Sequence, residues 1–155
     1  MKRNLLKKFV FAAMAVVMLA ACGGNEVDPR DAFVGAYAYT ATGSVDFQAG
    51  GLQVTLPLNK TGNLTLSKVG DGNKVVIEGY NNPINATVSG NQLILESNTW
   101  QSTSGGIEFD LTFTYGKATL SENQLTWDSD VYGNAKYSSI TADGNGDLSV
   151  VAIKQ

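Results

Sequence analysis

The chain has 155 residues, with 11 Lys and Arg against 14 Asp and Glu and no His. All three Met precede its single Cys, Cys22, so it can form no internal disulfide, no His-based triad, no zinc site and no haem ligation by His. If residues 1–21 are removed, the remaining 134 suffice for one domain with a core. That mature chain carries a formal charge of −7, which argues against nucleic acid or an anionic membrane surface as a partner.

Residues 1–21 have the features of a secretory signal peptide. Basic residues, Lys7 and Lys8 among them, precede residues 9–21 (FVFAAMAVVMLAA), which carry no charge. A helix that spans a membrane needs about 20 apolar residues, so this shorter segment predicts a signal peptide rather than a permanent anchor.

Residues 19–22 (LAAC) match a bacterial lipobox. Cleavage before Cys22 would leave its thiol to accept diacylglycerol, and acyl chains such as palmitate, at about 0.8 kcal/mol per buried CH₂, make the anchor stable once two or three are present. No Asp follows Cys22, which favours the outer membrane and leaves the periplasmic or surface face open. The alternative is an ordinary secretory signal with a chance Cys.

Residues 22–30 are predicted to form a flexible tether from the acylated Cys22, because they contain two Gly, a Pro and no apolar periodicity. The folded domain is expected over residues 31–155.

Alternation of apolar and polar residues predicts that this domain is all-β. Residues 107–115 place Ile107, Phe109 and Phe113 on one face, and Glu108 and Asp110 on the other. Residues 52–58 alternate in the same way, with Pro57 tolerable only near a strand end or sheet edge. Residues 75–77 and 150–151 are apolar on both faces, which suggests strands covered on both sides.

Turn residues separate these segments about every ten positions, and they are expected at residues 59–63, 71–73, 81–83, 90–91, 105–106, 122–123 and 143–146. An antiparallel meander of eight to ten strands removes its edges by closing into a barrel. A two-sheet sandwich is the alternative. Residues 86–93 (ATVSGNQL) recur as residues 118–125 (ATLSENQL), which predicts two hairpins with a common turn.

Residues 33–37 (FVGAY) resemble the F-x-G-x-W/Y opening of lipocalin-type barrels. With the lipobox and the residues 89–93 hairpin (SGNQL), they make the chain similar to the calycin-like β-barrel lipoproteins of Gram-negative bacteria. The resemblance implies a calycin-like barrel with a cup-shaped pocket and no catalytic residue. Tyr37 stands where lipocalins carry Trp, and the sequence shows no Arg partner for it from a late strand.

Residues 143–147 (DGNGD) imitate the first ligands of a calcium-binding EF-hand loop. Position six is Leu148 and position twelve is Lys154, so a hairpin turn is the preferred interpretation, with calcium bound there or at Asp128 and Asp130 as the alternative. Glu108 and Asp110 could in principle act as a glycosidase pair, but their neighbours favour a solvated strand face.

The sequence predicts a non-enzymatic protein without a cofactor or a metal. We expect a monomeric barrel that binds a small apolar or amphipathic ligand, or else a structural module that presents loops to a protein or glycan. Trp127 is expected to point inward and Trp100 to be partly exposed. The candidate pocket wall consists of Tyr37, Phe109, Phe113 and Trp127.

Overall fold

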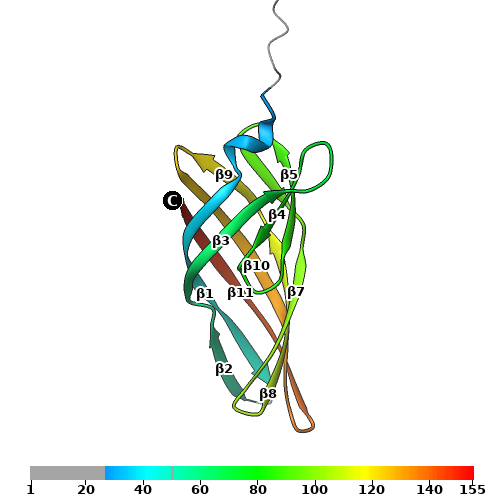
Figure 1. The fold of residues 1–155 in the computed structure, drawn as a ribbon. Helices are drawn as coiled ribbons and strands as arrows, with labels where there is room; N and C mark the ends of the chain where they lie inside the picture. The colour runs from blue at the N-terminus through cyan, green and yellow to red at the C-terminus, as the bar shows by residue number, and fades with distance from the viewer. Residues whose placement is uncertain (1–26, 50) are drawn as a thin grey trace, which may run out of the picture.

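The computed structural model describes residues 27–49 and 51–155. These residues form one 3₁₀ turn and eleven strands, which confirms the all-β prediction (Figure 1). The elements are η1 (Pro29–Ala32), β1 (Gly35–Ala49), β2 (Leu52–Pro57), β3 (Lys60–Lys68), β4 (Lys74–Glu78), β5 (Ile84–Ser89), β6 (Gln92–Leu95), β7 (Asn98–Ser104), β8 (Ile107–Tyr115), β9 (Lys117–Ser121), β10 (Gln124–Tyr137) and β11 (Ile140–Lys154).

Eight of these strands close into an antiparallel barrel. The hydrogen-bonded order runs β1-β3-β4-β5-β6-β9-β10-β11 and returns to β1. We call this part the closed half; it carries η1 and the C-terminus, at the upper end of Figure 1. The chain therefore forms a barrel rather than the alternative two-sheet sandwich.

The three longest strands, β1, β10 and β11, continue below the closed half. There β2 pairs with residues 44–49 of β1, β8 pairs with residues 129–136 of β10, and β7 pairs with β8. The result is a sheet in the order β2-β1-β11-β10-β8-β7, which we call the open half. Its far end, the hairpin end, holds the β1–β2, β7–β8 and β10–β11 turns (Figure 1).

Side chains alternate between the barrel interior and solvent along every long strand. On β8, Phe109, Leu111 and Phe113 are buried whereas Glu108 and Asp110 are exposed, as the sequence predicts. Pro57 is the last residue of β2, as expected.

One prediction about the strand faces is wrong. Val75, Ile77 and Val150 are buried, but Val151 is exposed and Val76 is only half-buried. The wall of the barrel is a single sheet with one face in solvent, so an apolar residue at an outward position marks no second layer.

Glycines lie where the long strands pass each other most closely. A Cβ added to Gly43 would overlap the carbonyl oxygen of Asp147, and one added to Gly146 would overlap that of Ser44. At Gly144 the ring of Phe47 occupies the place of the missing side chain. The predicted turn at residues 143–147 is therefore wrong: these residues lie inside β11, where Gly is needed for close approach.

The actual turn between β10 and β11 is at Ser138, whose φ of 55° is in the left-handed region. The repeated segments do form two hairpins, β5–β6 and β9–β10, as predicted. These hairpins are neighbours, because β6 pairs with β9 and the Leu120 N–H donates to the Asn91 carbonyl at 2.9 Å.

The N-terminal segment contacts the closed half. Asp28 caps η1, Arg30 donates to the carbonyl of Gly70 at 2.8 Å, and Lys68 lies 2.9 Å from the Asp28 carboxylate. The last residues of the expected tether thus pack against the barrel. Residues 1–26, including the expected signal peptide and Cys22, lie outside the described residues.

Candidate functional site

The four expected wall residues are all buried in one continuous core, Tyr37 and Trp127 on barrel strands and Phe109 and Phe113 on β8 of the open half. Tyr37, Phe109, Phe113 and Trp127 expose between 0% and 4% of their surface. The Phe109 ring lies 5.6 Å from that of Phe47, and the Phe113 ring lies 6.1 Å from that of Tyr115. Trp127 is inward and Trp100 is half-buried, as predicted.

An apolar hollow of about 140 Å³ opens instead at the hairpin end of the molecule. Its walls come from the β1–β2, β7–β8 and β10–β11 hairpins. Three of its residues remain partly in solvent: Val54 at 39%, Ile140 at 49% and Tyr137 at 58% exposed. The lining residues are Phe47, Ala49, Val54, Ile107, Ala135, Tyr137, Ile140 and Ala142.

Sequence reasoning missed this hollow because it is built from the tips of three hairpins. Only Ile107 and the alternation around Val54 marked inward positions there. The pairing of Ala135 with Ala142 across β10 and β11 depends on a register that the sequence does not specify.

The barrel interior also holds three buried polar atoms without a hydrogen-bond partner among the described residues. They are the Tyr39 hydroxyl, the Trp127 indole nitrogen and the Ser129 hydroxyl. The neighbouring phenol of Tyr115 is satisfied, since it donates to Asn98 Oδ1 at 2.8 Å. Burial raises the pKa of Tyr80 and of Tyr115 well above the ordinary value.

The opening motif of the domain is packed around Tyr37. The Tyr37 hydroxyl donates to the carbonyl of Phe33 at 2.7 Å, and Phe33 is itself fully buried. Lys154, from the last strand, lies 5.9 Å above the Tyr37 ring and donates to the Ala32 carbonyl at 3.0 Å. Sequence analysis missed this cationic partner, because only the β1–β11 register places Lys154 opposite Tyr37.

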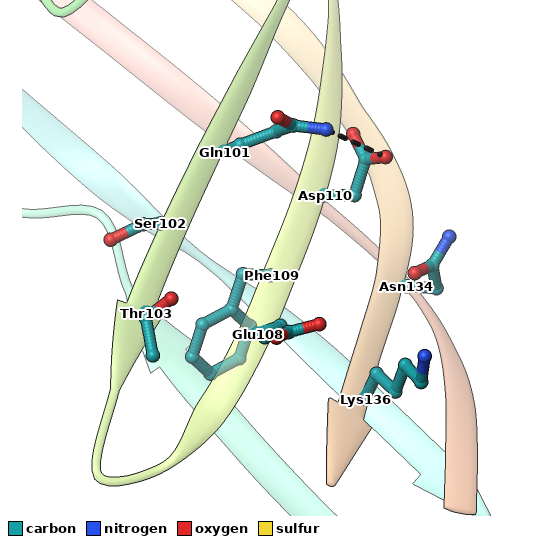
Figure 2. Close-up of a pocket in the computed structure, with 8 residues that line it drawn as sticks. All are labelled: Gln101, Ser102, Thr103, Glu108, Phe109, Asp110, Asn134 and Lys136. Carbon is teal, nitrogen blue, oxygen red and sulfur yellow. Dashed lines mark hydrogen bonds between the residues drawn. The ribbon is translucent and has the colours of Figure 1, made fainter.

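A shallower hollow of about 550 Å³ lies along β7, β8 and β10 (Figure 2). Glu108 and Asp110 are exposed on its surface, in the solvated position that the sequence indicates. Gln101 Nε2 donates to Asp110 Oδ2 at 3.4 Å. The other residues that line it are Ser102, Thr103, Phe109, Asn134 and Lys136.

The acidic residues considered for calcium lie on two neighbouring extended strands, Asp128 and Asp130 on β10 and Asp143 and Asp147 on β11. Asp130 is paired with Asp147 across the two strands, whereas Asp128 is paired with Ser149 and Asp143 with Asn134. Within residues 27–49 and 51–155, no three His, Cys, Asp or Glu residues are grouped so that they could hold a metal ion. The same part of the chain contains no helix with the length and apolarity needed to cross a membrane.

No protein-family model matches the chain, and no curated protein sequence matches it. Among solved structures, the ywiB protein from Bacillus subtilis aligns with 77% of this chain and 93% of its own, at 11% identity and a TM-score of 0.26. A similarity at this level adds nothing to the barrel described above.

Proposed function

We propose that the protein is an envelope lipoprotein, anchored through Cys22, whose barrel binds a small apolar or amphipathic molecule without catalysing a reaction. The apolar hollow at the hairpin end carries the ligand proposal. Its exposed rim residues, Val54, Tyr137 and Ile140, surround a concave apolar surface. Covering such a surface with a ligand is favourable by about 25 cal/mol per Å² of apolar area.

The size of the hollow limits what it can accept. A cavity of about 150 Å³ holds one benzene molecule, so about 140 Å³ fits a single ring or the end of an alkyl chain. The acidity of the chain beyond Cys22 disfavours a carboxylate ligand. We therefore propose a neutral molecule with one apolar end.

The closed half supports the calycin-like part of the proposal. Eight antiparallel strands close around a core that begins with the buried Phe33 and Tyr37 of the opening motif. Lys154 supplies a late-strand cation over Tyr37, where the sequence showed no Arg. The hollow opens at the end opposite η1, and hence away from the end that the tether enters (Figure 1).

Lipid attachment is tested by labelling cells with a radioactive fatty acid. The wild-type protein should carry label, and the Cys22→Ala variant should carry none. Separation of the two membranes should then place the labelled protein in the outer membrane, and protease added to whole cells distinguishes the surface face from the periplasmic one. Equal labelling of both proteins would contradict the proposal.

Ligand binding is tested on the chain from Val27 onward, once circular dichroism has shown it to be β-rich. Addition of 1-octanol should shift the methyl resonances of Ile107, Ile140 and Ala142 in a saturable manner. Ala142→Phe should abolish these shifts by filling the hollow, whereas Ala36→Phe adds the same ring on the outer surface and should leave them unchanged.

Shifts that rise without saturation, or that persist in Ala142→Phe, would contradict ligand binding. The exposed rim would then favour the alternative function, a non-enzymatic module whose hairpin tips contact another protein.

A further inference from the structure

The outer face of the open half carries two rows of polar side chains in register across three strands. Gln101 on β7, Asp110 on β8 and Asn134 on β10 form the first row. Thr103, Glu108 and Lys136 form the second row in the same order. Figure 2 shows both rows along the 550 Å³ hollow.

An exposed aromatic ring continues this face beside the first row. Tyr132 is two residues before Asn134 on β10, so both side chains point to the same face. The Tyr132 side chain is 52% exposed to solvent. Its cross-strand neighbours, Thr112 and Asn145, are polar, so the ring has no apolar partner in either adjacent strand. No apolar cluster explains its position, since the core lies on the opposite face of the sheet.

The polar groups of the two rows are largely unused within the protein. Gln101 and Asp110 share the one side-chain hydrogen bond among these residues, at a long 3.4 Å. The remaining carboxylate, amide, hydroxyl and ammonium groups have no side-chain partner among the described residues, so their donors and acceptors are available to a ligand.

We propose that this outer face binds a neutral oligosaccharide. The ring of Tyr132 would pack against the C–H face of one sugar unit, and the amide and carboxylate groups of Asn134 and Asp110 would hydrogen-bond its hydroxyls. The hollow has a volume typical of small-ligand sites. Glu108, Asp110 and the nearby Asp143 outnumber Lys136, which disfavours sulfated or uronic acid chains.

The site is independent of the apolar hollow, because the two occupy opposite faces of the same strands. Asn134 points outward from β10 toward the saccharide surface, whereas the next residue, Ala135, lines the apolar hollow. Failure of one proposal therefore leaves the other in place.

The test is isothermal titration of the full chain, purified in a detergent without a sugar headgroup, with cellohexaose, xylohexaose and maltohexaose. We expect saturable binding of at least one of them. Tyr132→Ala should weaken it about tenfold or more, and Asn134→Ala should weaken it severalfold. Tyr132→Phe keeps the ring and should bind within about threefold of the wild type.

Ile153→Ala is the matched control, since Ile153 is also 52% exposed but lies on the outer face of the closed half. It should bind like the wild type. Absence of binding to all three sugars, or equal binding by the wild type and Tyr132→Ala, would overturn the proposal. If Tyr132→Ala is misfolded by circular dichroism, unchanged binding by Asn134→Ala overturns it instead.

Discussion

The closed and open halves share the same three long strands but differ in how many strand edges they leave unpaired. In the closed half every strand has two neighbours, because β11 joins β1 to β10 and completes the ring. In the open half β2 and β7 are edges, each paired on one side only. The core extends through both halves, from Tyr37 near η1 to Phe109 near the hairpin end.

The open edges of one half explain why partly exposed apolar residues line the hollow at the hairpin end. Closure buries the inward side chains of the upper strands, whereas the hairpin end leaves Tyr137, Ile140 and Val54 at the rim of a hollow. The two edges are protected by their sequences: β2 is short and ends in Pro57, and β7 is polar except for Trp100. Both candidate binding surfaces therefore lie on the open half, although the core is shared by the two halves.

The largest effect is expected where the two halves meet. Gly146→Ala would place a methyl group on the carbonyl of Ser44 and force β1 away from β11, so it should cost about 4 kcal/mol or prevent folding. In Gly116→Ala the nearest atom, Asp128 O, is 3.2 Å away, so a shift of a few tenths of an ångström accommodates the methyl group and stability should change by about 1 kcal/mol or less. Urea unfolding measures both, and equal costs would contradict the close approach at the junction.

The next largest losses of stability are expected from truncating core side chains, one in each half. Phe109→Ala in the open half should cost about 3–5 kcal/mol, and Leu93→Ala in the closed half about 2–5 kcal/mol, because both side chains are buried. Glu108→Ala, on the outer face beside Phe109, should change the free energy of unfolding by less than about 0.5 kcal/mol. A larger loss at Glu108 than at Phe109 would reverse the assignment of inner and outer faces.

The burial pattern of individual strands and two of the hairpins could be predicted from local sequence. The alternation over residues 107–115 specified which side chains of β8 are buried, and the two repeats specified two of the hairpins. Those features depend on neighbouring residues only. Closure was likewise favoured by the eight to ten strands expected and their short connections, and the structure has eleven strands, of which eight close.

The errors came from features that depend on strands far apart in the chain. The residues 143–147 segment has the composition of a turn, but its glycines accommodate the backbone of β1 and the Phe47 ring. Lys154, 117 positions after Tyr37, lies over the Tyr37 ring only because β1 pairs with β11 in this register. The apolar hollow and the polar rows on the outer face of β7, β8 and β10 likewise require a register that alternation alone does not determine.

A smaller effect distinguishes two tyrosines on the same face of β1. Tyr37→Phe removes a hydroxyl that donates to the Phe33 carbonyl and should destabilise the protein by about 1 kcal/mol. Tyr39→Phe removes a buried hydroxyl without a partner among the described residues and should stabilise it by about 1 kcal/mol. Thermal unfolding of both variants gives the comparison. Destabilisation by Tyr39→Phe would contradict the prediction, because it would mean that this hydroxyl makes a favourable hydrogen bond in the folded protein.

The smallest effect concerns the N-terminal contacts of the closed half. Hydrogen bonds from Arg30 and Lys68 hold the pKa of Asp28 well below its ordinary value of 3.8. Because the pKa is lower in the folded state, these contacts stabilise η1 fully above about pH 4 and lose that contribution as the pH falls further. Exposure to solvent and salt keeps the effect small.

Hydrogen exchange at the backbone N–H of Asp31, which donates to the Asp28 carbonyl at 2.9 Å, reports on these contacts. Exchange corrected for intrinsic rate should accelerate below pH 4 in the wild type, and Asp28→Asn should be equally fast at all pH values. Asp143→Asn, in the open half, should behave like the wild type. Since the contacts belong to the closed half alone, amides of β8 should show no such acid response. An acid response shared by β8 would mean that the two halves loosen together rather than separately.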